Sequence, residues 1–345
     1  IVAAFWITCA TSLCECSAIS SPKGVPSIGF IARKVMGASY EYPCLMSTTG
    51  RRGNSSRAGI LAVLGAAFCF GTTGTTQQLG VPDISPVAVA SARLLCGSVF
   101  LFIFAFLIER RNSKYRMPRT DLLIAGCGIA IYQLTFFSAV DSTGIAIATV
   151  TALGTAPTFS AIVAYLILRE KPLLNWYLGT SVTIIGIVLV GTANGVEGFN
   201  LLGILLASIA GLGFAIFNVI CRKSLEKGAS DIWVTAQTFG VAAIASAPFL
   251  FAESPVWLTT RNGILTTLWL GIFTTSVGYI LFMYGLKRIP SSLAATVVLA
   301  EPATATILAA VVIGEPLVAQ SYLGIATVAL GILYISKSKR ASASL

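Results

Sequence analysis

The chain has 345 residues and no histidine, and only 10% of its residues are charged. Without imidazole side chains, the sequence excludes histidine-based acid–base catalysis, serine–histidine triads and imidazole metal sites. Its eight cysteines form no metal-binding motif, and Cys69, Cys96, Cys127 and Cys221 lie singly in apolar runs, as small core residues do. We therefore expect no metal, no cofactor and no enzymatic activity.

The low charge content also argues against a soluble protein. Soluble domains carry about a quarter charged residues, whereas this chain is 56% hydrophobic. Its net charge of +10 would suggest nucleic-acid binding in a soluble protein, but here the charges lie in short segments between apolar runs. We therefore expect a multi-pass protein of the inner or plasma membrane, with the lipid bilayer and not a nucleic acid as its partner.

The first 45 residues differ from the rest. The apolar run at 1–13 is too short to span a bilayer core of about 30 Å, and it lacks the basic start of a signal peptide. Met46 opens a short basic leader before the first long apolar run. We expect translation to start at Met46, or less favourably at Met36, and residues 1–56 to be an extension without fixed structure; a genuine disordered tail is the alternative.

Continuous apolar runs long enough for membrane helices recur through the rest of the chain. A spanning helix needs roughly 20 apolar residues. The sequence predicts an all-α integral membrane protein with ten such helices, at about 58–78, 86–108, 120–140, 144–168, 173–192, 200–221, 231–251, 263–285, 291–313 and 318–336.

The basic residues predict how these helices are oriented. Cytoplasmic loops of membrane proteins carry an excess of Lys and Arg. Eighteen Lys and Arg residues fall in the leader, in alternate loops and in the 337–345 tail, whereas the other loops contain only Arg261. This distribution predicts that both termini are cytoplasmic.

The second half of the chain repeats the first. At an offset of 145, Pro157 matches Pro302 and Gly186 matches Gly331, while a weaker match at an offset of 144 links the segments that begin at Gly59 and Gly203. These matches predict two five-helix repeats, at 57–192 and 200–336. Because five is odd, the second repeat crosses the membrane in the opposite sense, an inverted-topology repeat found in many secondary transporters.

Several motifs carry a resemblance to a known family. They include "ASARLL" (90–95), "FFSAVDSTG" (136–144), "GTAP" followed by "EK", and "LAEPATATILAAVVIGEP" followed by "YLGIATVALGILYI". Over residues 57–336 the chain resembles the EamA-like ten-helix exporters of the drug/metabolite transporter superfamily. The resemblance implies export of amino acids, other small metabolites or drugs, usually coupled to protons. The acidic residue of the first helix in small multidrug members is missing here, so their mechanism is not implied.

Glu301 is the main candidate for a functional charge. It lies ten residues into the predicted helix at 291–313, which at 1.5 Å per residue places it about 15 Å deep, near the membrane midplane. Ionisable residues at this depth mark substrate or proton pathways. The structural alternative is that a protonated Glu301 donates a hydrogen bond to a backbone carbonyl freed by the kink, since Pro302 leaves the Val298 carbonyl without its helical partner.

Four further polar residues are candidates for substrate binding or coupling. Arg93 lies about 10 Å inside its predicted helix, where it could bind a substrate carboxylate or Glu301, or extend to the interface. The repeat relates Arg93 to Gln237 and Gln133 to Tyr279, so both halves place polar groups at similar depths. For each of these softer candidates, ordinary packing is the alternative.

The matched prolines, Pro157 and Pro302, are predicted to kink their helices symmetrically. Glu170 and Glu315 end the same two helices, and we expect both to be interfacial, with Lys171 partly neutralising Glu170; a gating role is the alternative.

Together these features predict a secondary active transporter. We expect a proton-coupled exporter of small metabolites such as amino acids, working by alternating access. Drugs, sugars or nucleotide sugars are alternative substrates, and a membrane-embedded enzyme is a remote alternative. The sequence does not distinguish a monomer from a homodimer.

Overall fold

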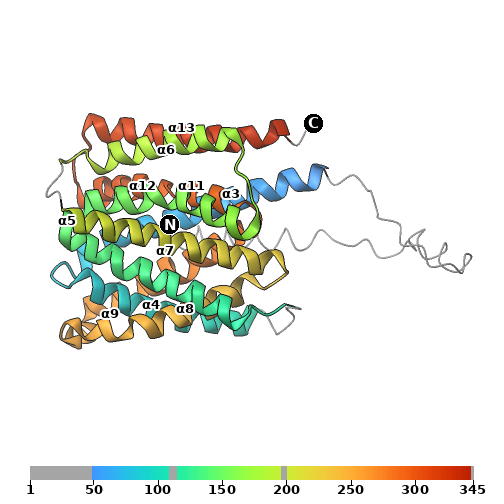
Figure 1. The fold of residues 1–345 in the computed structure, drawn as a ribbon. Helices are drawn as coiled ribbons and strands as arrows, with labels where there is room; N and C mark the ends of the chain where they lie inside the picture. The colour runs from blue at the N-terminus through green and yellow to red at the C-terminus, as the bar shows by residue number, and fades with distance from the viewer. Residues whose placement is uncertain (1–48, 109–114, 196–199, 343–345) are drawn as a thin grey trace, which may run out of the picture. The chain divides into compact units, whose positions relative to one another are not determined.

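The computed structural model describes residues 49–108, 115–195 and 200–342 of the chain. All regular secondary structure in these residues is helical (Figure 1). Of the extension predicted at 1–56 without fixed structure, residues 49–56 are helical as the start of α3, and residues 1–48 lie outside the described residues.

The helices follow the predicted ranges closely. In chain order, the α-helices are α3 (Thr49–Gly80), α4 (Pro86–Ile108), α5 (Arg119–Leu168), α6 (Leu174–Gly191), α7 (Leu201–Glu226), α8 (Asp231–Ser246), α9 (Arg261–Leu268), α10 (Gly278–Leu286), α11 (Ser291–Val297), α12 (Ala300–Leu308) and α13 (Ala319–Ser342). Two 3-10 segments, η1 (Ala247–Ala252) and η2 (Pro255–Thr259), and two π-helical segments, η3 (Trp269–Val277) and η4 (Ala309–Ile313), join or extend them. In the described residues, nine helical passages are long and apolar enough to span a membrane.

One of the nine, α5, contains 50 residues and is broken at Gly144, whose φ of 81° lies outside the helical region. The direction of the chain reverses there. Before the break, α5 runs antiparallel to α7, because Gly203 near the start of α7 packs against Thr143 while Gly213 packs against Gly128.

After the break, the second arm of α5 runs parallel to α7. Gly211 packs against Ala152, and Asn218, further along α7, donates a hydrogen bond to Ser160 at 3.4 Å. The two arms, 119–143 and 145–168, thus form a hairpin, and at 1.5 Å per residue each is about 36 Å long, enough to span a bilayer. Counting the arms separately gives ten passages; the number of membrane crossings and the side of the termini stay predictions.

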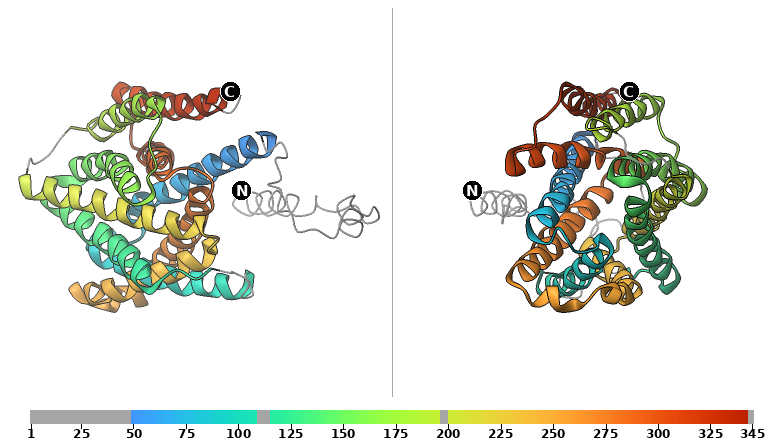
Figure 2. Two further views of the ribbon diagram at one scale, coloured as in Figure 1. Left: turned by 45° about the vertical axis from the view of Figure 1, so that its right-hand side comes forward. Right: turned by 90° about the vertical axis from the view of Figure 1, so that its left-hand side faces the viewer.

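Glycines hold α6 and α13 together, and this pair lies side by side along one edge in Figure 1 and in both views of Figure 2. Gly179 packs against Gly331, and Gly186 packs against Gly324. The repeat matches Gly179 with Gly324 and Gly186 with Gly331. The contacts are crossed: Gly179 of α6 touches the counterpart of Gly186, and Gly186 touches the counterpart of Gly179. This exchange is the pattern that a two-fold relation between the repeats produces.

Large apolar side chains are exposed along the helices. Examples on five different passages are Leu107, Leu166, Ile244, Val311 and Leu330, each more than half exposed. A soluble surface rarely carries so much contiguous apolar area, whereas lipid covers it without cost. The exterior of the helices therefore suits a hydrocarbon environment.

The basic residues gather at one end of the helices, called here the basic end. It comprises Arg169, Lys171, Arg222, Lys223, Lys287 and Arg288. Ion pairs tie helix termini together there: Lys223 Nζ lies 3.0 Å from Asp121 at the start of α5, and Lys287 Nζ lies 3.9 Å from Asp231 at the start of α8. At the opposite end, the Ser85 N–H donates to Glu253 at 2.8 Å.

Candidate functional site

Arg93, on α4, reaches α5 and α3. Its Nη2 donates to Gln133 Oε1 at 2.8 Å, and its Nη1 lies 3.5 Å from Thr73 Oγ1. Its guanidinium carbon lies 5.9 Å from the ring centroid of Phe137. Gln133 is buried, with 2% of its surface exposed. Two residues predicted from the sequence as candidates are thus brought into direct contact, and Arg93 points inward instead of extending to the interface.

This pair leaves two hydrogen-bond donors unused. Arg93 Nε and Gln133 Nε2 are both buried, and neither has an acceptor in the described part of the chain. A buried donor without a partner costs about 1–3 kcal/mol. The arrangement therefore offers two N–H groups, one of them charged, to an acceptor that the described residues do not supply.

Glu301 lies just after the short turn that separates α11 from α12 in the passage Ser291–Ile313. Val298 and Leu299 separate α11 from α12, and the Glu301 N–H donates to the Val298 carbonyl at 2.9 Å. The carbonyl that Pro302 cannot serve is thus bonded by the backbone, so the carboxyl group is not needed there. The Glu301 side chain is partly buried and forms no hydrogen bond or ion pair within the described residues. The structural alternative predicted for Glu301 is therefore not what the structure shows.

Residues 70–73 of α3 link the candidates. The Phe70 ring centroid lies 4.7 Å from that of Tyr279, Gly71 packs against α12, and Thr73 is the hydroxyl beside Arg93. One turn of α3 thereby contacts the helices that carry Arg93 and Glu301 and the ring of Tyr279. Thr73 could not be identified from the sequence, because a hydroxyl in an apolar helix is common and usually bonds its own backbone.

Glu301 completes this central cluster, defined here as Arg93, Gln133, Tyr279 and Glu301. The carboxyl group lies close enough for its charge to act on Arg93, Tyr132 and Tyr279, although it makes no ion pair with Arg93. An acidic and a basic side chain thus lie near each other inside the protein without forming an ion pair.

Aromatic rings surround Tyr279 on its other sides. Its ring centroid lies 4.3 Å from that of Phe239 and 6.0 Å from that of Phe217, and 6.3 Å from that of Phe282. Those three phenylalanines are completely buried. They form a packed wall behind the cluster, which sequence reasoning missed because phenylalanine on a membrane helix usually faces lipid or core.

Two other predictions stand apart from the cluster. Gln237, on α8, is partly buried and makes no hydrogen bond within the described residues, so its role stays a prediction. Pro157 lies inside the second arm of α5, whereas the matched passage changes its backbone hydrogen bonds to an i→i−3 pattern at Leu299 and Glu301, just before Pro302. The predicted symmetry of the two prolines does not extend to a symmetric break in the helices.

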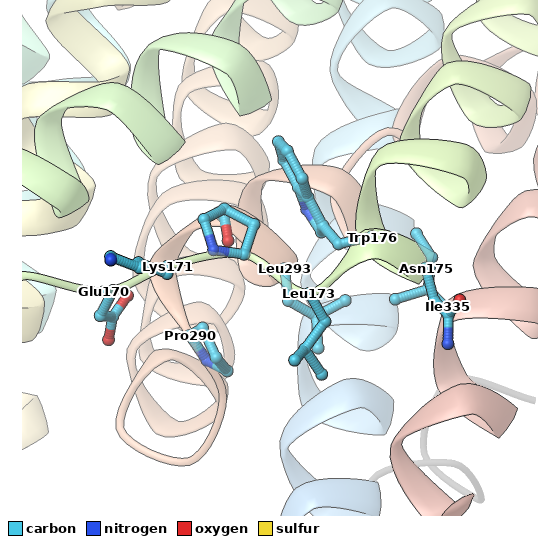
Figure 3. Close-up of a pocket in the computed structure, with 10 residues that line it drawn as sticks. Glu170, Lys171, Leu173, Asn175, Trp176, Pro290, Leu293 and Ile335 are labelled. Atoms are coloured by element: carbon cyan, nitrogen blue, oxygen red, sulfur yellow. The ribbon is translucent and has the colours of Figure 1, made fainter. Parts of the chain in front are cut away.

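The prediction for Glu170 was wrong in its partner. Glu170 Oε1 lies 3.5 Å from Arg222 Nε, while Lys171 is exposed and lies over the ring of Tyr165. Glu170 borders a hollow of about 180 Å³ at the basic end, shown in Figure 3 with Trp176 and Pro290 among its lining residues. A hollow of about 390 Å³ at the opposite end is bordered by Asp83 and Arg261 instead.

A helical protein with an apolar exterior, matched halves and a few buried charges belongs to the class of membrane transporters. The profile of the EamA-like transporter family matches residues 57–192 and again 201–337. The chain therefore belongs to the EamA-like transporter family, and it is a multi-pass membrane protein.

Relatives and a solved structure agree with this assignment. The chain is 36% identical over 280 residues to the uncharacterized transporter YwfM of Bacillus subtilis, covering 81% of this chain and 94% of the relative. It is 24% identical to the uncharacterized inner membrane transporter YicL of Salmonella typhimurium, covering 83% and 97%. A solved crystal structure at 17% identity covers 82% of this chain and 98% of its own, with a TM-score of 0.70, which shows a shared fold.

Proposed function

We propose that this transporter is a secondary active exporter of small metabolites that carry a carboxylate, such as amino acids, and that it works by alternating access. The observation that carries the proposal is the Arg93–Gln133 pair with its two unused buried donors. Arginine is the side chain best suited to bind a carboxylate, because its N–H groups match the two oxygens. A carboxylate placed against Arg93 Nε and Gln133 Nε2 would satisfy both.

Glu301 supplies the complementary charge. Its carboxylate is free of hydrogen bonds within the described residues, so it can accept an amine from the substrate or exchange a proton with water. A zwitterionic amino acid would contact Arg93 through its carboxylate and Glu301 through its amine. Protonation of Glu301 would release the amine, which couples the proton to the substrate.

The two repeats support alternating access. Inverted repeats allow the halves to rock around a site that stays near the midplane. The cluster draws on both repeats, with Arg93 and Gln133 from the first and Tyr279 and Glu301 from the second. Rocking one repeat against the other would therefore change the geometry around the bound substrate.

A drug exporter of the same fold is the second candidate, and the aromatic wall around Tyr279 is the observation that favours it. Lipophilic cations bind to aromatic faces and a carboxylate. However, Phe217, Phe239 and Phe282 are completely buried against each other. Their ring faces are therefore not accessible to a bound cation. The polar Arg93 side of the cluster therefore favours a carboxylate substrate over a lipophilic cation.

Export from cells tests the proposal. Cells that overproduce the transporter would be loaded with labelled dipeptides that release single amino acids, and the efflux of each amino acid would be followed. We expect faster efflux of at least one amino acid than in cells that produce the Arg93→Gln variant. Equal efflux for every amino acid, together with resistance to cationic drugs, would favour the second candidate.

A further inference from the structure

The basic end is closed by contacts that join four helical termini. Besides Arg222, Glu170 Oε2 accepts the Ser291 N–H at the start of α11 at 3.3 Å. Arg222 Nη1 donates to the carbonyls of Leu286, at the end of α10, and of Ile289, the latter at 2.8 Å. Glu170 ends the second arm of α5 and Arg222 belongs to α7. One ion pair thus fixes the ends of α5, α7, α10 and α11 together.

Deeper contacts continue this closure along α11. Asn218 Nδ2, on α7, donates to the Ser291 carbonyl at 3.0 Å and to Ser160 at 3.4 Å. Trp176 Nε1, on α6, donates to Thr296 Oγ1 at 3.0 Å. All nine residues from 291 to 299 are buried. At the basic end, α11 is therefore held by α5, α6 and α7, and the hollow of Figure 3 borders it at Ser292 and Leu293.

The counterparts of Glu170 and Arg222, related by the repeat, lie at exposed positions. The repeat offsets relate Glu170 to Glu315 and Arg222 to Gln78, and both counterparts are exposed. Within the described residues neither side chain has a hydrogen-bond or ion-pair partner. No residue from 304 to 316 is buried, whereas the matched stretch of the first repeat buries Ser160.

The separation begins at a definite point along α3. Gly71 packs tightly against Thr304 and Ala305 of α12. Gly74 lies three residues further, on the same face of the helix, yet a Cβ there would meet nothing within 4 Å. Gly74 is the counterpart of Asn218, which is fully buried. Contact between α3 and α12 is therefore close at Gly71 and is lost by Gly74, towards the opposite end.

We infer that Glu170, Arg222 and the N-terminus of α11 form a gate that opens and closes the basic end. The structure is then the state of the transport cycle that is closed at the basic end and open at the opposite end. The inference rests on the proposed alternating access. In the converse state, the Glu170–Arg222 bridge separates, and the helices around Glu315 and Gln78 come together.

Two reporter cysteines test the gate without a substrate. Ser160→Cys places a thiol behind the gate at a fully buried position, and Gly74→Cys places one in the open half. A membrane-impermeant maleimide would be applied to inside-out and right-side-out vesicles, and labelling above that of the parent chain would be measured. With the gate intact, we expect Gly74→Cys to react from its own side and Ser160→Cys to react slowly from either side.

Opening the gate should change both reporters in opposite directions. Combined with Glu170→Gln, we expect Ser160→Cys to label at least tenfold faster from the basic side and Gly74→Cys to label more slowly. Arg222→Gln should act in the same way, and the double variant should add little, because both changes break one bridge. Glu226→Gln is the matched control: it removes another acid, 2.8 Å from Arg222, but within α7, so it joins no two helices.

Faster labelling of both reporters would indicate general loosening and would overturn the gate, as would unchanged labelling in both gate variants. These outcomes do not depend on substrate, since the reaction is with maleimide. Failure of the efflux experiment would instead overturn the carboxylate substrate and leave the labelling result standing.

Discussion

Arg93 shows how one side chain can both be held and remain available. Its Nη groups are directed to Gln133 and Thr73, which fix the plane of the guanidinium, while its Nε is left without an acceptor. Lysine has the same charge but no fork to be fixed in this way. The role proposed for Arg93 therefore depends on geometry as well as on charge.

Replacing Arg93 by Lys should thus weaken carboxylate binding and leave the turnover of bound substrate largely intact. We expect KM to rise about tenfold, which corresponds to about 1.4 kcal/mol of binding free energy, and Arg93→Gln to abolish transport. Initial rates of efflux at several substrate concentrations would measure this. Arg261→Gln, which removes an exposed basic residue at the opposite end, serves as the control and should transport normally.

Glu301→Gln keeps the size of the side chain and removes its charge and its exchangeable proton. In membrane vesicles with an imposed pH gradient, we expect proton-driven flux to be lost. Exchange of labelled for unlabelled substrate without a gradient should persist, although more weakly, because the site still forms. Glu226→Gln provides a carboxylate-to-amide control on an exposed side chain. Flux that still follows the pH gradient in Glu301→Gln would remove Glu301 from the coupling role.

Depth along a predicted helix was enough to find Arg93 and Glu301, because a charge inside an apolar run is rare. It was not enough to find Thr73, Phe137 or Phe239, which join the site only through the packing of different helices. Threonine and phenylalanine are ordinary in membrane helices, so no local pattern marks them.

At the scale of helices, small residues decide where two passages can approach. A Cβ at Gly186 would come within 2.6 Å of the Val328 backbone nitrogen, which cannot move aside as a side chain tip could. A Cβ at Gly154, on the second arm of α5, would instead lie 3.8 Å from the end of the Ile187 side chain. A side chain at Gly186 would therefore clash with α13, whereas Gly154 has room for one.

Gly186→Ala should separate α6 from α13 and destabilise the protein, while Gly154→Ala should not. In a helix interior, alanine is favoured over glycine by about 1 kcal/mol, so Gly154→Ala should be neutral or stabilising. We expect the Tm of the detergent-solubilised protein to fall for Gly186→Ala by several degrees relative to Gly154→Ala. Equal Tm values would contradict the close contact between the two helices.

The helical ranges were predictable because continuous apolar runs and basic loops both mark them. The details of the breaks were not. Both prolines predicted a kink, but only the passage of Pro302 shows a local change, where Leu299 and Glu301 donate to the carbonyls three residues back, Thr296 and Val298. Proline removes a hydrogen bond in both copies, and the neighbours of each helix then determine how the backbone hydrogen bonds rearrange.

At the scale of the whole molecule, the gathering of basic residues at one end agrees with the orientation predicted from the loops. The state of the transport cycle had no such signature in the sequence. In the proposed alternating access, matched residues of an inverted repeat exchange environments between the two states, so the sequence is equally consistent with both. The inferred state is distinguished by the packing of Asn218 and the Glu170–Arg222 pair, set against the exposure of their counterparts Gly74, Glu315 and Gln78.

The predicted orientation can be tested with exposed positions at the two ends. Gly228→Cys, between α7 and α8, should react with an impermeant maleimide only in inside-out vesicles. Asp83→Cys, between α3 and α4, should react only in right-side-out vesicles. Reaction of both cysteines from the same side would contradict the predicted path of the chain through the membrane.

The hairpin within α5 has a consequence for how the protein is made. Gly144 alone joins its two arms, so no polar loop separates one from the other. If both arms cross the membrane as predicted, they enter the bilayer together during synthesis, because no hydrophilic loop follows the first arm. The charges that orient this unit, Arg119 before it and Arg169 and Lys171 after it, all lie at the same end. Lengthening the turn at Gly144 with glycine and serine should therefore leave insertion intact while uncoupling the two arms during folding.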